Sequence, residues 1–290
     1  MTKICCLILN YNDSDTTIQL LDILMNYEAI YKIVVVDNCS SDDSFKKLSG
    51  YHNEKIVLLR ADKNGGYGYG NNYGIKYICE VLHAAYFILM NPDTLITEQT
   101  IIKLVDFLDS NREYVLAAPV QRLKSQQGEI AFPWKLGSVW NGIFTNSIFI
   151  SKLFHLDLRY KQSDIEENTV LDVDVVQGAL FAANTEFMYK YGKYDENIFL
   201  YNEEECIAQK IKKNKRKSAL LCKEIYIHNH STSINKSIKS LVKQKKIKEQ
   251  SRKIYLEKYY TMSLFQKIVM QIIMKIGIAE IRIYSAIRKI

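Results

Sequence analysis

Short apolar runs alternate with longer stretches of helical periodicity through the first 120 residues of the chain. Runs of this kind, bounded by turn residues, are typical of buried strands, and their alternation with helices predicts an α/β fold with a mostly parallel sheet. The predicted strands are Ile4–Leu9, Ile33–Asp37, Ile56–Leu59, Tyr86–Met90 and Val115–Val120, and the predicted helices lie near residues 15–27, 42–49, 70–82 and 97–110.

The pattern weakens after residue 121. Residues 122–168 show neither period, so we expect a long functional loop region there instead of another strand–helix unit. Regularity then returns along the chain. It predicts an ordered segment over residues 173–183, a helix from Thr185 to Gly192, a helix from about Glu203, and late strands at residues 218–222 and 225–227.

Charge separates the end of the chain from the rest. Residues 236–290 carry 14 Lys and Arg against 3 Glu, a local net charge of +11, while the whole chain carries +7. We therefore expect a mildly acidic main domain over residues 1–235 and a basic helical extension over residues 236–290. This asymmetry suggests an anionic surface as partner for the extension and argues against nucleic acid.

Residues 264–290 are apolar but interrupted by polar positions. No run of 18 apolar residues exists, so a membrane-spanning helix is not expected. Two interpretations stay open: an amphipathic helix lying on an anionic membrane surface, or a helix packed back on the main domain with a solvated basic edge. The polar positions that gather on one side of this helix are Lys267, Gln271, Lys275, Arg282, Ser285 and Lys289, and Glu280 breaks the pattern.

Cysteine usage and the first residues bear on the cellular compartment. Six cysteines occur without a Cys-x-x-Cys pair or a zinc-type spacing, which predicts reduced and mostly buried thiols in a cytosolic protein. Met1 leads directly into the first apolar run, so we expect no signal peptide.

Polar side chains follow several of the predicted strands. Asn-Tyr-Asn at 10–12, Asp37 and Asn-Pro-Asp at 91–93 each come directly after an apolar run. Open α/β sheets bind ligands at the carboxyl ends of their strands, and an Asp there suits a divalent cation beside phosphates. An Asp at 37 also offers a fixed acceptor for a base imide or a ribose hydroxyl. Turn or helix-cap roles remain the simpler interpretation of each carboxylate alone.

Two further segments carry candidate chemistry. Residues 64–74 (NGGYGYGNNYG) contain glycines that allow close backbone approach to a ligand, ahead of a helix N-terminus that favours phosphate. The segment follows the third predicted strand and lacks the third glycine of a dinucleotide fingerprint. Glu203, Glu204 and Glu205 begin a later helix; capping needs only one or two carboxylates, so the others are available as a general base.

In order and spacing, these segments resemble family 2 glycosyltransferases of the GT-A fold, especially the bacterial rhamnosyltransferase-like branch, over about residues 3–235. The implied nucleotide-binding half is 1–121 and the acceptor-binding half 122–235. The matching segments are residues 10–12 (NYN), 36–42 (VDNCSSD), 64–74, 91–93 (NPD), 178–179 (GA), 199–204 (FLYNEE) and His228-x-x-Ser231-x-Ser233.

The resemblance implies a role for each matching residue. Asn91 stands at the first acidic position of an Asp-x-Asp metal motif, so Asp93, with His228, is expected to hold Mg²⁺ or Mn²⁺. Glu204 is the expected general base and Glu203 the second choice, while Glu205 is expected to face solvent. The residues expected to contact the nucleotide-sugar are Asn10, Asp37, Asn38, Asn64, Gly66, Asn72 and Asn91.

The implied reaction is inverting transfer of one sugar from a UDP-sugar or dTDP-rhamnose to a saccharide acceptor. The acceptor is expected to be carried on a polyprenyl diphosphate lipid, at the cytoplasmic face of the membrane, in capsule or O-antigen synthesis. Cys206 stands where the family has a further acidic residue, and Gln209 or Lys210 replaces a common Arg. The absence of a Gln-x-x-Arg-Trp segment argues against a processive synthase. An NAD-dependent nucleotide-sugar-modifying enzyme and a degenerate transferase acting as an assembly partner remain alternatives.

Overall fold

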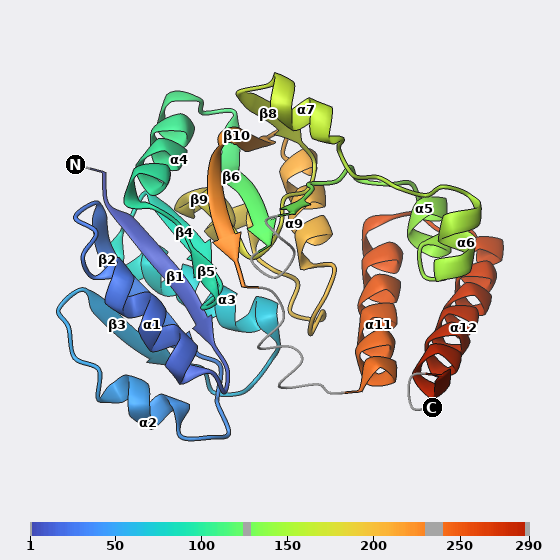
Figure 1. Cartoon of the computed structure of the whole chain (residues 1–290), viewed down its shortest axis with the longest axis horizontal. Coiled ribbons are helices and arrows are strands. Elements are labelled where there is room, and N and C mark those ends of the chain that lie inside the picture. Colours follow the sequence, from blue (N-terminus) through green and yellow to red (C-terminus); the bar gives the residue numbers. More distant parts are fainter. Residues whose placement is uncertain (1, 124–128, 230–239, 288–290) are drawn as a thin grey trace.

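The structure is a computed structural model that describes residues 2–123, 129–229 and 240–287. Within these residues a ten-stranded mixed sheet lies between helices, and a separate group of helices stands beside it (Figure 1). The strands are β1 (Ile4–Asn10), β2 (Ile30–Asp37), β3 (Ile56–Arg60), β4 (Tyr86–Met90), β5 (Thr94–Leu95), β6 (Tyr114–Leu123), β7 (Ile130–Ala131), β8 (Val170–Val173), β9 (Leu180–Asn184) and β10 (Lys217–His228).

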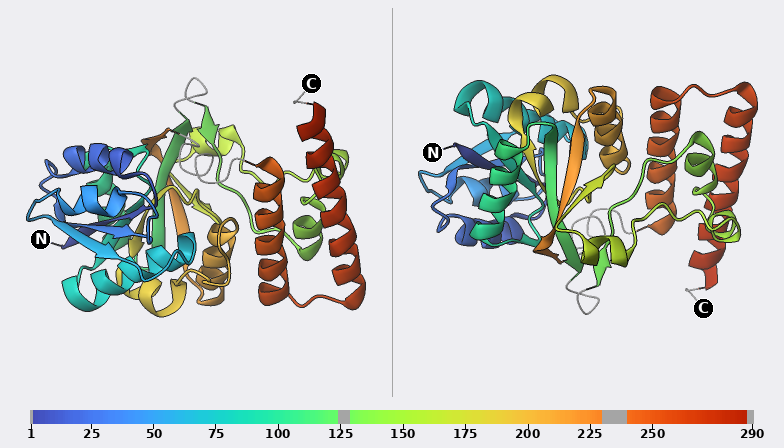
Figure 2. Two further views of the ribbon diagram at one scale, coloured as in Figure 1. Left: turned by 90° about the horizontal axis from the view of Figure 1, so that it is seen from below. Right: turned by 90° about the horizontal axis from the view of Figure 1, so that it is seen from above.

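The helices fall into those that cover the sheet and those that stand beside it. Those associated with the sheet are α1 (Ser14–Leu24), α2 (Ser44–Ser49), α3 (Tyr67–Tyr77) with the π-helical turn η1 (Ile78–Leu82), α4 (Glu98–Ser110), α7 (Gln162–Glu167), α8 (Thr185–Phe187) with the π-helical turn η3 (Met188–Gly192), and α9 (Glu203–Lys213). Those beside it are α5 (Val139–Phe144), α6 (Ile148–Leu153), α11 (Leu241–Tyr259) and α12 (Leu264–Ile287) (Figure 2).

The strand order brings several strand ends to one edge. The order is β3-β2-β1-β4-β9-β6-β10-β5, with β7 added to β6 and β8 added to β10. Strands β1 to β4 are parallel, so the residues after β1, β2 and β4 meet at one edge. Strand β9 runs antiparallel to β4 and starts at this edge, while β10 runs parallel to β6 and ends beside β5.

Alternating residues of the strands build a core on each face of the sheet. In β1, Cys6 and Ile8 pack with α1 and α4, whereas Cys5 and Leu7 pack on the opposite face with α3 and α9. All four side chains are fully buried. All five early strands form, and β1, β2, β4 and β6 are mostly buried as the continuous apolar runs predicted, whereas β3, at the edge of the sheet, is only partly buried.

A third core joins the helical group to α9. Ile143 of α5, Cys206 of α9, Leu256 of α11 and Met270 of α12 are all buried in it. Polar contacts add to this attachment: Lys258 forms an ion pair with Asp195 at 2.7 Å. The helical extension is therefore packed against the preceding chain through α11, and α12 packs in turn on α5 and α11.

Two expectations about secondary structure were wrong. Residues 122–168 are not one loop, because β7 and the helices α5, α6 and α7 lie there; each helix has six residues, too few to display a clear period. The two late strands are a single strand, β10, whose register with β6 shifts between Leu221 and Ile225. The polar pair Lys223-Glu224 at this irregularity interrupts the apolar pattern.

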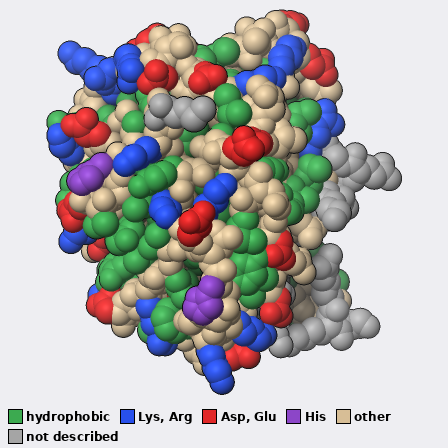
Figure 3. Space-filling model, turned by 90° about the vertical axis from the view of Figure 1, so that its left-hand side faces the viewer, with side chains coloured by type: hydrophobic (Ala, Val, Ile, Leu, Met, Phe, Trp, Pro, Cys, Tyr) green, Lys and Arg blue, Asp and Glu red, His purple; other side chains and the backbone are tan. Residues whose placement is uncertain are grey.

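The described part of the extension packs on its neighbours, which is one of the two interpretations left open by the sequence, and contact with a membrane stays a prediction. One side of α12 is buried against its neighbours through Met270, Ile273, Met274 and Gly277, while Lys267 and Lys275 are exposed. The expected boundary between residues 235 and 236, and Lys289, lie outside the described residues. No described helix is long and apolar enough to cross a bilayer. On the opposite end of the molecule, nearest β3, basic and acidic side chains are interspersed (Figure 3).

Candidate active site

A cavity of about 950 Å³ opens between the edge of the sheet and α11. Its walls come from the segments after β1, β2 and β4, the end of β10, the start of α9, and one side of α11. Eight residues expected at the site line it: Asn38, Asn64, Gly66, Asn91, Asp93, Glu203, Glu204 and His228. Asn10, Asp37 and Asn72 do not line it.

Asp93 and His228 are brought together by strand pairing. Thr94 of β5 is the register partner of His228 of β10, and the backbone N–H of Asn229 donates to the carbonyl of Asp93 at 2.9 Å. Oδ1 of Asp93 consequently lies 3.1 Å from Nε2 of His228. Both side chains are at most one-tenth exposed. A carboxylate and an imidazole thus meet at the floor of the cavity.

Gln121 of β6 fixes the ring of His228 from behind. Its Nε2 lies 3.1 Å from Nδ1 of His228, and its Oε1 accepts from the buried hydroxyl of Tyr226. In this arrangement the amide donates to Nδ1, and the imidazole proton sits on Nε2, toward Asp93. Metal ligation through Nε2 would need the other tautomer, with the proton on Nδ1. If the Gln121 amide were turned over, its Oε1 would accept a hydrogen bond from that N–H.

A divalent cation fits the chemistry of this pair. No group of three or more His, Cys, Asp or Glu suited to a metal occurs among the described residues. One or two carboxylates are nevertheless enough for Mg²⁺ when substrate phosphates and water complete its coordination. Asp93 and His228 supply one hard oxygen and one nitrogen, so a bound metal here would depend on the substrate for its remaining ligands.

Asn91 is held in place by Tyr67 and β9. The Tyr67 hydroxyl lies 3.0 Å from Oδ1 of Asn91 and 3.0 Å from the carbonyl of Gly178, so its proton is shared between them. The backbone N–H of Asn91 donates to the carbonyl of Ala179 at 2.8 Å. With Oδ1 accepting from Tyr67, the amide Nδ2 of Asn91 is the part of this side chain left to donate to a ligand.

Asn38 and Asn64 form a polar rim on the other side of the cavity. Nδ2 of Asn38 donates to Oδ1 of Asn64 and to the carbonyl of Gly66, each at 3.1 Å. Oδ1 of Asn38 is buried without a hydrogen-bond partner among the described residues. A buried acceptor of this kind is costly unless a donor reaches it, which favours a ligand N–H or O–H at this position.

Asn10 and Asp37 lie behind the cavity. Nδ2 of Asn10 donates to Oδ2 of Asp37 at 2.9 Å, and Oδ1 of Asn10 accepts from the Thr17 hydroxyl at 2.9 Å. Oδ1 of Asp37 accepts from the backbone N–H of Ser40 at 3.0 Å. Both residues are fully buried. In this structure they tie the loops after β1 and β2 together, and nucleotide contact by them stays a prediction.

The glycine-rich segment approaches the chain's own backbone. Gly66 has φ of 96°, and a Cβ there would meet the carbonyl of Phe199 at 2.3 Å. The first N–H of α3, from Tyr67, donates to the same carbonyl at 2.9 Å. Asn72 is also internal, because it exchanges hydrogen bonds with the backbone of Tyr194 at 2.8 and 3.1 Å. The carbonyl of Phe199 therefore occupies the place at this helix N-terminus where a phosphate was expected.

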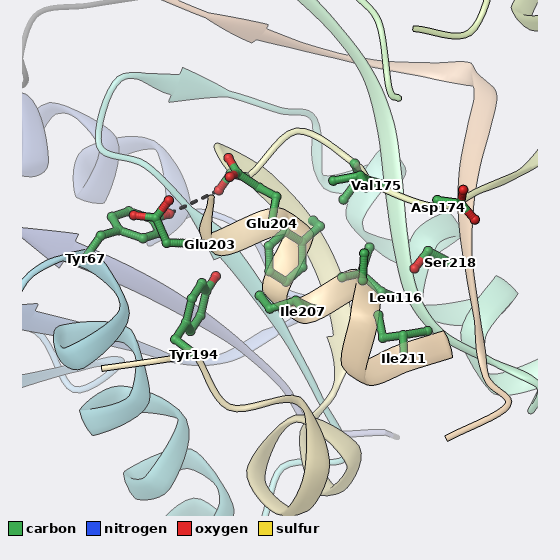
Figure 4. Close-up of a pocket in the computed structure, with 14 residues that line it drawn as sticks. Tyr67, Leu116, Asp174, Val175, Tyr194, Glu203, Glu204, Ile207, Ile211 and Ser218 are labelled. Carbon is green, nitrogen blue, oxygen red and sulfur yellow. Dashed lines mark hydrogen bonds between the residues drawn. The ribbon is translucent and has the colours of Figure 1, made fainter. Parts of the chain in front are cut away.

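The two expected bases begin α9 on a strained turn. Tyr201 and Asn202 both have positive φ, 73° and 68°, which is costly for a tyrosine and is tolerated mainly at functional sites. Figure 4 shows Glu203 and Glu204 turned toward Tyr67, with the Tyr194 hydroxyl directed toward the same pair. A small cavity of about 20 Å³ adjoins them, with room for about one water molecule.

Burial controls the protonation of this pair. Burial, and then the charge of Glu204, raises the pKa of Glu203 well above its usual value. Burial, and then the charge of Glu205, raises the pKa of Glu204 to about 7. Oε1 of Glu203 has no hydrogen-bond partner within the described part of the chain, which also favours the neutral form. Glu204 is thus the carboxylate better matched to accept a proton near neutral pH.

Gly178 makes room for Glu204. A Cβ at position 178 would come within 2.6 Å of Oε1 and 3.0 Å of Cγ of Glu204. A backbone hydrogen bond from Gly178 also favours the ionised form of this carboxylate. The glycine therefore sets the position of the carboxylate beside the segment that carries Asn91.

The remaining acidic and basic positions depart from expectation. Glu205 does not face solvent: its side chain is 12% exposed and pairs with Arg252 of α11 at 3.4 Å. Cys206 points into the third core and is fully buried. Gln209 donates to the hydroxyls of Tyr255 and Tyr260, at 3.1 and 2.8 Å. The matched Ser231 and Ser233, with His230, lie outside the described residues.

Several residues that shape the site were not identified from the sequence. Tyr67 and Gln121 hold Asn91 and His228. Tyr67 is one of three tyrosines in the glycine-rich segment, and Gln121 follows an apolar run, so neither side chain stands out in the sequence. Lys248 and Arg252 line the cavity from a helix that the sequence assigns to a separate extension. Their contribution follows only from the packing of α11.

Comparison with known proteins identifies relatives of this architecture. A family model described as Glycosyl transferase family 2 matches residues 5–162. The low-salt glycan biosynthesis hexosyltransferase Agl10 of Haloferax volcanii is 24% identical over 198 residues, which are 68% of this chain and 58% of that protein. The chain thus spans less than two thirds of this relative's length.

Solved structures share the fold at low sequence identity. GalNAc-T7 with UDP, GalNAc and Mn²⁺ has a TM-score of 0.61 and 15% identity, covering 79% of this chain and 44% of that one. Staphylococcus aureus TarS 1-349 with UDP-GlcNAc has 0.56 and 13%, covering 93% and 70%. The mannosyltransferase PcManGT of Pyrobaculum calidifontis, with GDP-Man and Mn²⁺, has 0.53 and 12%, covering 98% and 75%. The expected GT-A-like fold is confirmed.

Proposed function

The chain belongs to glycosyl transferase family 2, and we propose that it transfers one sugar from a nucleotide-sugar donor to a saccharide acceptor with inversion at the anomeric carbon. The observation that carries the proposal is the convergence of Asp93, His228 and Glu204 on one cavity. The first two residues suit the diphosphate end of a donor, and the third suits the acceptor hydroxyl.

The proposed donor site runs from Asn38 to Asp93. Asn38 and Asn64 would meet the nucleoside, and the Nδ2 of Asn91 would donate to a phosphate oxygen. Asp93 and His228 would hold Mn²⁺ or Mg²⁺ against the diphosphate, and the ion would stabilise the charge of the departing nucleoside diphosphate. Solved relatives in complex with UDP, UDP-GlcNAc or GDP-Man support a nucleotide-sugar donor.

Glu204 is the proposed general base. The acceptor oxygen forms a bond to the anomeric carbon as the bond from that carbon to the diphosphate oxygen breaks, and the hydroxyl proton passes to Glu204. The raised pKa of this carboxylate brings its proton affinity close to what transfer at neutral pH requires. Glu203, buried and neutral, would donate or accept a hydrogen bond beside it.

The sugar is proposed to be a hexose or a deoxyhexose. The likeness to a hexosyltransferase supports the first, and the motif resemblance to the rhamnosyltransferase-like branch supports the second. The proposed setting is assembly of a bacterial surface polysaccharide such as a capsule or O-antigen. The acceptor would be linked to a polyprenyl diphosphate.

The test is an assay for release of nucleoside diphosphate from UDP-hexoses and dTDP-rhamnose, with Mn²⁺ or Mg²⁺ present. Donor hydrolysis or transfer that falls at least a hundredfold in Glu204→Gln supports the proposal. Absence of release from every donor, or full function of a Glu203→Gln/Glu204→Gln double variant, would favour the degenerate-transferase alternative. Binding of NAD by the wild type in a fluorescence titration would favour the alternative of an NAD-dependent nucleotide-sugar-modifying enzyme.

We also propose that the protein sits on the cytoplasmic face of an anionic membrane. The helical group carries an apolar face, defined as the exposed apolar side chains of α6 and α12 and the residue after α6. Its members are Ile148, Phe149, Leu153, Phe154, Leu264, Phe265, Ile268, Ile272, Ile276, Ile283, Tyr284 and Ile287. Contiguous exposed apolar surfaces of this extent mark interaction sites.

Aromatic contacts link two parts of the apolar face, and positive charge lies beside it. Ring contacts run from Phe265 to Trp140 at 6.2 Å, from Trp140 to Phe144 at 5.4 Å, and from Phe144 to Phe154 at 5.9 Å. Lys267, Lys275 and Arg282 are exposed along the same helix. Apolar side chains beside a row of cations fit an anionic bilayer, into which the former insert while the latter meet headgroups.

Sedimentation with vesicles tests this attachment. The wild type should pellet with phosphatidylglycerol vesicles and remain soluble with phosphatidylcholine, and Phe149→Asp with Ile272→Asp should abolish pelleting. Val81→Asp, at an exposed apolar position on η1 away from the face, is the matched control. Wild-type protein that ignores both vesicles, or that buries the face by dimerising, would contradict the proposal.

A further inference from the structure

Helix α11 forms one wall of the catalytic cavity. Lys243, Ile247, Lys248 and Arg252, at helical spacing, all line it. The helix is anchored in this position, because the Ser251 hydroxyl donates to the carbonyl of Leu200 at 2.7 Å, one residue before the strained turn that precedes α9. We call Lys243, Lys248 and Arg252 the α11 basic wall.

The basic wall faces the acidic start of α9. Arg252 pairs with Glu205 at 3.4 Å, whereas neither lysine of the wall has a carboxylate within 4.0 Å in the described part of the chain. Lys248 lies close enough to Glu204 and Glu205 for their charges to influence its pKa. Burial first, and then the positive charges of Arg252 and Lys245, nevertheless lower that pKa.

The simplest role for the wall would be to neutralise the carboxylates of α9, but the wall carries more positive charges than those carboxylates require. Glu203 is held neutral by burial, and Glu205 is already paired with Arg252. Glu204 is then the one carboxylate of the three whose ionised form needs a cation, while two lysines remain to be matched. This excess of positive charge is carried by α11, whereas the expected metal pair, Asp93 and His228, is carried by the sheet.

We propose that the α11 basic wall binds a diphosphate group on the acceptor. The phosphates would lie along Lys243 and Lys248, and the reacting hydroxyl of the attached sugar would point to Glu204. This inference rests on the proposed transferase function, and it assigns the acceptor to the class of sugars carrying an anionic phosphate near the accepting hydroxyl. The diphosphate could belong to a lipid-linked sugar or to a soluble sugar diphosphate.

Binding to the full chain in metal-free buffer with EDTA isolates this wall from the donor site. Without a cation, the Asp93 carboxylate repels phosphate, so calorimetry with farnesyl diphosphate and inorganic pyrophosphate reports on α11. The variants are Lys243→Gln/Lys248→Gln and, as matched control, Lys246→Gln, which is exposed on the same helix and does not line the cavity.

The inference predicts that the double variant binds both diphosphates at least tenfold more weakly than the wild type, and that Lys246→Gln binds them as the wild type does. Stronger binding of farnesyl diphosphate than of pyrophosphate would identify a lipid-linked source, and equal binding a soluble one. Wild-type affinity in the double variant, or no binding of either probe to the wild type, overturns the inference.

Two further readouts separate this inference from the proposed function. If the lysines only tune Glu204, the double variant will shift the acid limb of the pH profile for donor hydrolysis while leaving diphosphate affinity intact, and the inference fails. Binding of UDP with Mn²⁺ should be equal in all variants. If the wild type binds the diphosphate probes but does not bind UDP with Mn²⁺, the transferase function is contradicted while the anion site on α11 is supported.

Discussion

Oδ1 of Asp93 lies 3.1 Å from Nε2 of His228, although 135 positions separate the two residues in the sequence. The antiparallel pairing of β5 with β10 creates this contact, because His228 is the register partner of the residue after Asp93. A short two-residue strand therefore determines whether the expected metal ligands meet at all. The catalytic hypothesis depends on this pairing more than on any single motif.

Replacing Gln121 with Leu should weaken metal-dependent nucleotide binding while leaving the proposed metal ligand, His228, in the chain. Gln121 orients the His228 ring through its Nδ1, and a ligand histidine that loses such a partner typically loses ten- to a hundredfold in metal affinity. The measurement is the Mn²⁺ concentration at half-maximal UDP binding. Unchanged Mn²⁺ dependence in Gln121→Leu would show that the ring orientation is immaterial.

Glu204→Gln and Glu203→Gln should differ in their kinetic effect. Loss of a general base lowers kcat by about 10²- to 10⁴-fold, which we expect for Glu204→Gln. Glu203→Gln should lower it less than tenfold, because glutamine retains the neutral hydrogen-bonding form that burial already imposes. The steady-state rate of donor hydrolysis by each variant measures both effects. Equal losses in the two variants, or a larger loss in Glu203→Gln, would contradict the assignment of Glu204 as the base.

The pH dependence of the wild-type rate follows from the same pair. The deprotonated form of Glu204 is the active one, and its pKa is raised to about 7. We therefore expect kcat to rise with pH up to about 7 and to level off above it. A profile already flat from pH 5 upward would mean that the proton acceptor has an ordinary carboxyl pKa.

Gly178→Ala should reduce activity while leaving the fold intact. The added Cβ would lie 2.6 Å from Oε1 of Glu204, so the carboxylate has to move away from the segment that carries Asn91. A displacement of this size in a catalytic group costs roughly a hundredfold in kcat. Far-ultraviolet circular dichroism and UDP affinity serve as controls, and near wild-type kcat would contradict the assigned position of Glu204.

Asn72→Ala should affect stability more than nucleotide binding. The side chain exchanges hydrogen bonds with Tyr194 and donates to Glu196 at 2.9 Å, so its removal leaves buried backbone groups unpaired. The expected loss in the free energy of unfolding is about 1–3 kcal/mol. Urea unfolding measures it; a variant of wild-type stability with weakened UDP binding would instead favour the direct nucleotide contact that the sequence suggested.

The strands and the polar residues at their ends could be predicted from the sequence because parallel strands such as β1, β2 and β4 bury both faces and must end at one ligand-binding edge. The network behind them could not. Tyr67 reaches Gly178 across 111 positions, and Gln121 reaches His228 across 107. Such contacts depend on strand order, which periodicity does not reveal.

The extension shows a second limit. Its charge and its apolar content predicted an amphipathic helix at the surface, and α12 does expose both apolar and basic side chains. Nothing in the sequence indicates that α11 lines the catalytic cavity, because Lys248 and Arg252 differ only in position from the other cations around them. The buried contacts of Leu256 and Tyr255 with the third core decide which side of α11 faces inward.

Calorimetric titration of UDP, with and without Mn²⁺, shows whether Asp93 and His228 form a metal-dependent donor site when the wild type is compared with Asp93→Ala and His228→Ala. Glu204→Gln serves as a control that should bind normally. We expect Mn²⁺-dependent binding by the wild type and by Glu204→Gln, weakened at least tenfold in the other two variants. Binding that is indifferent to Mn²⁺, or that survives both substitutions at full strength, would contradict a donor site at Asp93 and His228.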